Sequence, residues 1–118
     1  MSRYIGVAGY QCEIIAEKLK GLGLSCKSMD VSFEEPQVAE FLVKAAKSDV
    51  LVLIQPPDFS PGIDNIFYAQ LGAALALDKE CFVGCWHRPD NYPPNPFLLQ
   101  TTIFQTFEQL SSCLSETC

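Results

Sequence analysis

The pattern of hydrophobic and polar positions predicts strands and helices in alternation along the whole chain. Five short apolar runs are typical of strands, at residues 4–8, 25–29, 50–54, 81–86 and 101–104. Four segments carry apolar side chains at helical spacing, at about residues 12–22, 35–47, 66–77 and from 106 through 114. The run at 50–54, VLVLI, has no polar side chain, as expected of a central strand that is covered on both faces.

Alternation of this kind predicts an α/β protein, a three-layer sandwich around a five-stranded, mainly parallel sheet. Right-handed crossovers leave few strand orders, and we expect the flavodoxin-like order 2-1-3-4-5. No repeat, linker or low-complexity tract divides the chain, so we expect residues 1–118 to form a single domain.

The helix predicted over 66–77 is apolar on every side except for Gln70 and the hydroxyl of Tyr68. A helix of this composition is buried. Burying an amide costs about 2–7 kcal/mol unless the amide finds hydrogen-bond partners. Gln70 is therefore either a satisfied structural group or a residue that meets a ligand. Asp64, six residues earlier, is placed to cap this helix through the amides of its first turn.

The connections between the predicted elements differ in length at the two edges of the sheet. Those at the carboxyl edge are long and rich in proline, above all 55–64 and 87–96, whereas those at the amino edge are short turns. Ligands of open α/β sheets bind beyond the carboxyl ends of the strands, so we expect a site there. The candidate ligand-binding residues are Tyr4, Gly9, Tyr10, Pro56, Asp58, Asn91 and Tyr92.

Composition narrows the class of partner. The chain is 48% apolar with a net charge of −6, which is ordinary for a globular protein. Nucleic acids and anionic membranes demand clustered Lys and Arg, so we expect neither as a partner. No apolar run approaches the ~20 residues of a membrane span, and the N-terminus lacks a signal-peptide layout. These features predict a cytoplasmic protein.

The sequence lacks the common motifs for metals and cofactors. Its six cysteines form no CxxC pair and there is one histidine, so we expect buried free thiols and no metal site. Residues 6–10, GVAGY, contain neither a Walker A lysine nor the GxGxxG spacing. The first loop also lacks the hydroxyls with which flavodoxins hold the phosphate of flavin. We expect no cofactor.

Residues 48–83 resemble the nucleoside 2-deoxyribosyltransferases and the related deoxynucleoside-monophosphate N-glycosidases. The resemblance rests on SDVLVLI, a proline-rich loop, Asp64 and, after five residues, QLGAALALDK. It implies chemistry at the N-glycosidic bond of a nucleoside or nucleotide, through a Glu that forms a glycosyl-enzyme intermediate. It further implies that Asp64 binds sugar or base, that a tyrosine at Tyr4 or Tyr10 places the carboxylate, and that the protein is a homo-oligomer.

Gln70 stands where that family has its nucleophilic Glu, and a neutral amide cannot trap an oxocarbenium-like centre as a carboxylate does. Three explanations are open: a laboratory Glu→Gln substitution, a natural binder that lost the chemistry, or hydrolysis through Asp64 or Asp58. The corresponding functions are an N-glycosidic-bond transferase or hydrolase and a non-catalytic nucleotide-derivative-binding protein, such as a sensor or sequestering protein. A third is an interaction module with a vestigial pocket.

Overall fold

The computed structural model describes the backbone of residues 4–28, 43–55, 61–85 and 101–117, and their side chains except those of 61–66 and 117. Its elements, in chain order, are β1 (Ile5–Gly9), α1 (Cys12–Gly21), β2 (Cys26–Ser28), β3 (Val50–Ile54), α3 (Pro61–Ala76), β4 (Glu80–Gly84), β5 (Thr102–Phe104) and α4 (Phe107–Thr117). A short helical turn at 43–46 precedes β3.

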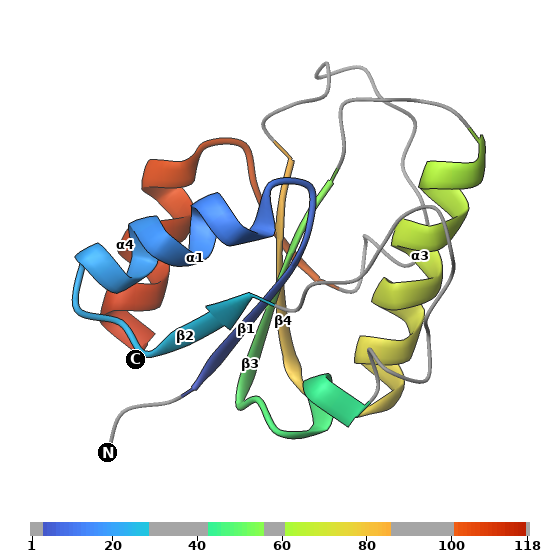
Figure 1. Ribbon diagram of the computed structural model, residues 1–118, viewed down its shortest axis with the longest axis horizontal. Coiled ribbons are helices and arrows are strands. Elements are labelled where there is room, and N and C mark those ends of the chain that lie inside the picture. Colours follow the sequence, from blue (N-terminus) through green and yellow to red (C-terminus); the bar gives the residue numbers. More distant parts are fainter. Residues whose placement is uncertain (1–3, 29–42, 56–60, 86–100, 118) are drawn as a thin grey trace.

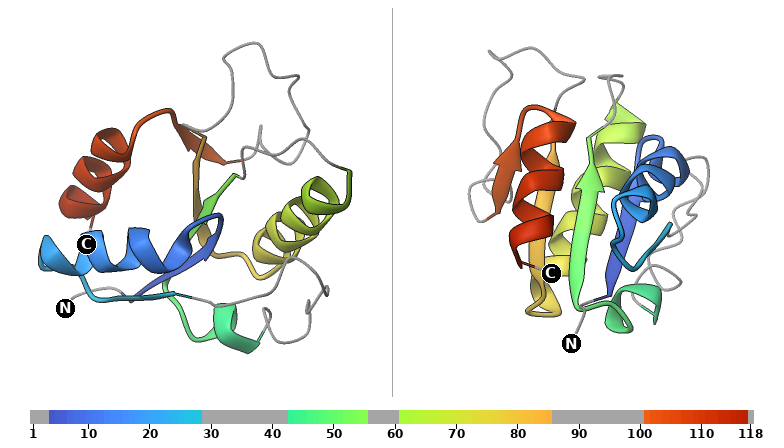
Figure 2. Two further views of the ribbon diagram at one scale, coloured as in Figure 1. Left: turned by 45° about the horizontal axis from the view of Figure 1, so that its top comes forward. Right: turned by 90° about the vertical axis from the view of Figure 1, so that its left-hand side faces the viewer.

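The five strands form one sheet in the order β2-β1-β3-β4-β5, and every neighbouring pair is parallel. Helices α1 and α4 cover one face of this sheet and α3 covers the other (Figures 1 and 2). The expected three-layer α/β sandwich and its flavodoxin-like strand order are therefore confirmed, with a sheet that is wholly rather than mainly parallel.

The core is divided between the two faces because side chains alternate along each strand. On β3, Val50, Val52 and Ile54 join the core under α1 and α4, whereas Leu51 and Leu53 join the core under α3. All five side chains are fully buried, as the continuous apolar run VLVLI predicts for a strand covered on both faces.

The boundaries of α3 correct the sequence prediction. The helix begins at Pro61, five residues before the predicted start at 66. The stretch SPGID reads as a loop, but proline has no amide hydrogen to lose and suits the first turn of a helix. Asp64 is consequently the fourth residue of the helix rather than its N-cap.

The boundaries of the remaining elements lie within three residues of their predicted positions, except for the helix expected over 35–47. The structure describes this segment as helical at 43–46, and the predicted start lies outside the described residues. None of the described helices combines the length and hydropathy needed to cross a membrane.

Candidate functional site

The end of β1 lies tightly against the end of β3. Gly9 has a φ of +97°, and a Cβ atom built on it would overlap the carbonyl oxygen of Ile54. The amide of the next residue, Tyr10, donates a hydrogen bond of 3.0 Å to that same oxygen. Only glycine fits here, because the left-handed backbone and the close approach both exclude a side chain. Tyr10 is half-buried and packs against the core under α1 and α4.

Three polar side chains meet at the carboxyl ends of β3 and β4. Gln55 is fully buried, and its Nε2 donates to the hydroxyl of Tyr68 on α3 at 3.1 Å. The thiol of Cys85 donates to Gln55 Oε1 at 2.7 Å. The backbone amide of Gln55 bonds the carbonyl of Gly84 at 2.9 Å, which holds the residue in line with β4. We call Gln55, Tyr68 and Cys85 the Gln55 cluster.

The candidate list from the sequence missed the Gln55 cluster, although one signal was present. Gln55 follows VLVLI directly, and two-residue alternation puts it on the same face as Leu51 and Leu53, towards α3. A polar residue that continues a buried stripe at the carboxyl edge is a candidate on that ground alone. Tyr68 and Cys85 could not be paired with it from the sequence, because their contact depends on how α3 lies across the sheet.

Gln70 is buried with only 2% of its surface exposed. It lies on α3 beside the fully buried residues Phe67, Leu71 and Ala74, which face the sheet. Its Oε1 atom has no hydrogen-bond partner among the described residues. At 3.6 residues per turn, Gln70 and Tyr68 lie on opposite flanks of this sheet-facing stripe, about 160° apart around the axis. The helix therefore points Gln70 away from the Gln55 cluster.

Asp64 shares α3 with Gln70 but not its face. Six residues of α-helix correspond to about 9 Å along the axis and about 120° around it. The side chain of Asp64 lies outside the described part of the chain, as do the candidates Pro56, Asp58, Asn91 and Tyr92. Their roles stay predictions.

Tyr4 lies at the opposite edge of the sheet from Gly9 and Tyr10. It precedes the first residue of β1, and its backbone amide donates to Asp49 Oδ2 at 2.8 Å, beside the start of β3. The five steps from Tyr4 to Gly9 span about 16 Å of strand. The structure therefore does not bring Tyr4 to the carboxyl edge, because the first residues of parallel strands all lie at the amino edge of the sheet.

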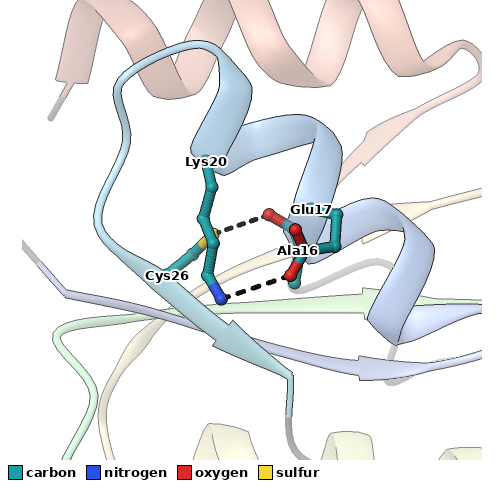
Figure 3. Close-up of polar contacts among 4 residues, drawn as sticks. All are labelled: Ala16, Glu17, Lys20 and Cys26. Carbon is teal, nitrogen blue, oxygen red and sulfur yellow. Dashed lines mark hydrogen bonds and ion pairs between the residues drawn. The ribbon is translucent and has the colours of Figure 1, made fainter.

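The contacts of two buried thiols, those of Cys26 and Cys81, fit a structural role. The Cys26 thiol donates to the carbonyl of Ala16 at 3.1 Å and so joins β2 to α1 (Figure 3). Burial raises the pKa of Cys26, and the nearby Lys20 ammonium partly offsets this. Burial, helped by the charge of Glu80, raises the pKa of Cys81 from 9.0 to about 11. Both thiols stay protonated at neutral pH, and a nucleophile or metal ligand would need the thiolate.

The chemistry around Gln55 and Gln70 is that of neutral hydrogen bonding. The groups described there are two amides, a phenol and a thiol. In the described ranges, no group of three His, Cys, Asp or Glu residues is placed to hold a metal ion. These side chains can orient a polar ligand, whereas transfer of a glycosyl group would need a carboxylate from elsewhere in the chain.

Comparisons with known proteins provide no family assignment for this chain. No model of a known protein family matches the sequence, and no curated protein matches it significantly.

Proposed function

We propose that the chain is a nucleoside 2-deoxyribosyltransferase-like protein that binds a nucleoside or nucleotide beside α3, with Gln70 at the nucleophile position and little or no turnover. The resemblance of residues 48–83 supports the ligand class. The strand order supports a ligand at the carboxyl edge, where open α/β sheets bind small molecules.

The observation that carries the proposal is the Oε1 atom of Gln70, which has no hydrogen-bond partner among the described residues. A buried acceptor without a donor costs about 1–3 kcal/mol, and native proteins contain few of them. A ligand that donates an O–H or N–H group to this oxygen would remove the cost. Sugar hydroxyls and the N–H groups of nucleobases are donors of this kind, so a nucleoside can supply the hydrogen bond that the described residues do not.

The same residue argues for binding rather than turnover. An amide carries no anionic oxygen to form a glycosyl-enzyme intermediate. Hydrolysis through another carboxylate is the second candidate function, and Asp64, six residues before Gln70 in α3, is the carboxylate that the resemblance offers for it. Cleavage by this route would make the protein an N-glycosidase without the family's nucleophile.

Thermal unfolding and base release together test the proposal. Wild type, Gln70→Glu and Gln109→Glu are incubated with a panel of deoxynucleosides and their monophosphates. We expect one ligand to raise the melting temperature of wild type without release of free base, as measured by chromatography. At 100 times Kd a ligand stabilises its protein by about 2.7 kcal/mol. We expect base release in Gln70→Glu alone.

Gln109→Glu is the matched control, because it makes the same chemical change at an exposed position on α4 and keeps an acceptor oxygen. It should behave as wild type. Base release by wild type that is lost in Asp64→Asn would replace binding by the hydrolase function. If no ligand on the panel shifts any melting temperature, the nucleoside proposal is wrong.

A further inference from the structure

A cavity of about 480 Å³ lies at the amino edge of the sheet, at the end opposite to the Gln55 cluster. Its lining includes Tyr4, Gly6, Lys27, Lys44, Lys47 and Ser48. These residues come from the start of β1, from β2, from the helical turn at 43–46 and from the segment that joins this turn to β3. Figure 1 shows the start of β1 and the helical turn (green) at the lower end of the molecule, with β2 beside β1.

The lining concentrates positive charge in an acidic protein. The chain has 8 Lys and Arg residues against 14 Asp and Glu, yet three of the lysines line this one cavity. Among the described residues, no acidic side chain belongs to the lining. The neighbouring carboxylate of Asp49 accepts a hydrogen bond from the backbone amide of Tyr4. Lys79 adds a fourth ammonium group at this edge, 3.3 Å from the carbonyl of Ala46.

The walls of the cavity are held by backbone pairing. The carbonyl of Tyr4 accepts from the amides of Asp49 and Val50 at 2.8 and 3.1 Å. Ser48 is 3% exposed, and its amide donates to the carbonyl of Ala45 at 3.0 Å. Their positions are therefore set by the sheet and the turn rather than by a ligand.

One residue of the cavity lining, Gly6, has no side chain. Gly6 pairs in register with Lys27 on β2. Alternation along β1 turns Gly6 to the same face as Ala8, under α3, and alternation along β2 turns Lys27 to that face as well. Lys27 thus lies beside a position that has no side chain.

We propose that this cavity is an anion site that binds a phosphorylated small molecule, separate from the nucleoside site. Lysine ammonium groups bind phosphate as point charges, and three lysines line this cavity. The volume is within the range of about 300–1,000 Å³ that is typical of small-molecule sites. Tyr4 and Val43 also line the cavity and can contact the remainder of the ligand. The site lies about one strand length, ~16 Å, from the carboxyl edge.

Binding of pyrophosphate and inorganic phosphate tests the site. Isothermal titration calorimetry is performed on wild type, Lys27→Gln/Lys47→Gln and Lys18→Gln/Lys20→Gln, with sodium chloride at matched ionic strength as the reference. The second pair lies on the exposed face of α1 and makes the same change in net charge. We expect pyrophosphate to bind wild type and the α1 variant equally, and the cavity variant at least about tenfold more weakly.

Amide chemical shifts locate the bound anion. In ¹⁵N-labelled protein we expect pyrophosphate to shift the amide signals of Gly6, Lys27 and Ser48, and to leave those of Gln55 and Gln70 unchanged. Equal weakening in both double variants would show a general charge effect and overturn the proposal. Pyrophosphate binding no stronger than that of chloride, or shifts confined to the carboxyl edge, would overturn it as well.

Discussion

Gln55 and Gln70 are both buried amides on the α3 side of the sheet, but their hydrogen bonding differs. Both ends of the Gln55 amide have partners, Tyr68 and Cys85. The Oε1 atom of Gln70 has none in the described part of the chain. Burial by itself therefore does not distinguish an amide that is satisfied within the protein from one that we propose to bind a ligand. The hydrogen-bond partners make that distinction, and they assign Gln55 to the structure.

Replacement of each amide by methionine measures the difference. Methionine has a similar length and no strong acceptor, so Gln70→Met should raise the free energy of unfolding by about 1–3 kcal/mol, because it removes an unsatisfied buried group. Gln55→Met should lower it, because Tyr68 and Cys85 lose their partner. Equilibrium urea unfolding measures both. A loss of stability in Gln70→Met would mean that the amide has a structural partner.

Cys81 gives the protein a specific pH dependence. Its pKa is about 11 in the folded protein against an ordinary value of 9.0, so the unfolded chain releases the proton first as the pH rises. The stabilising effect is complete below pH 9 and is lost between pH 9 and about 11. We expect the free energy of unfolding to fall more steeply over this interval in wild type than in Cys81→Ala. Urea titrations across the interval measure the two slopes, and parallel slopes would contradict the prediction.

At the scale of elements, the start of α4 shows how far a local motif can be predicted. The spacing of Thr106 and Gln109 predicts a capping box. The first bond is present, since Thr106 Oγ1 accepts from the amide of Gln109 at 3.2 Å. The return bond differs, because Gln109 Oε1 accepts from the amide of Gln105, one residue before the cap. The chain direction on entering from β5 decides which amide the side chain reaches.

The junction of β1 and β3 should be the position most sensitive to a single methyl group. In Gly9→Ala the new Cβ would overlap Ile54 O and lie 2.8 Å from Ile54 N, in addition to the strain of a φ of +97°. Backbone strain of this kind costs about 1–3 kcal/mol, and the overlap adds to it. We expect the free energy of unfolding, measured with urea, to fall by at least about 2 kcal/mol.

Two other glycines are controls for Gly9. Gly23 also has a positive φ, +87°, but a Cβ there meets no atom within 4 Å, so Gly23→Ala should show the strain alone. Gly21 ends α1 in open space, and Gly21→Ala should be neutral or slightly stabilising. Equal losses at Gly9 and Gly23 would show that the contact with Ile54 has no effect.

At the scale of the whole molecule, two cores lie on opposite faces of one sheet. Cys26 belongs to the core under α1 and α4, and Cys81 to the core under α3. Strands β1, β3 and β4 contribute to both cores, so one core cannot unfold without removing strands from the other. This arrangement predicts a single cooperative transition.

The two thiols report on the two cores separately. Pulsed alkylation at increasing urea, quantified for each cysteine by mass spectrometry, should give the same midpoint for Cys26 and Cys81. That midpoint should also match the loss of helix measured by far-UV circular dichroism. If Cys26 becomes reactive at a lower urea concentration than Cys81, the two faces unfold independently and the prediction is wrong.

The sequence by itself determined the alternation of elements, the buried central strand and the strand order. These follow from local periodicity and from the handedness of crossovers, which are properties of short segments. The burial of Gln70 followed in the same way, from the apolar residues around it in α3. The start of α3 did not, because proline and glycine are common in loops as well as in first turns.

Only the tertiary structure decided which distant side chains meet. It joined Gln55 to Tyr68 and Cys85, left Gln70 Oε1 without a partner in the described residues, and brought Lys27 and Lys47 to one cavity. It also placed Tyr4 at the amino edge, with those lysines. The physical reason is that side chains far apart in the sequence meet through strand pairing and the packing of helices on the sheet, and local composition does not encode those distances.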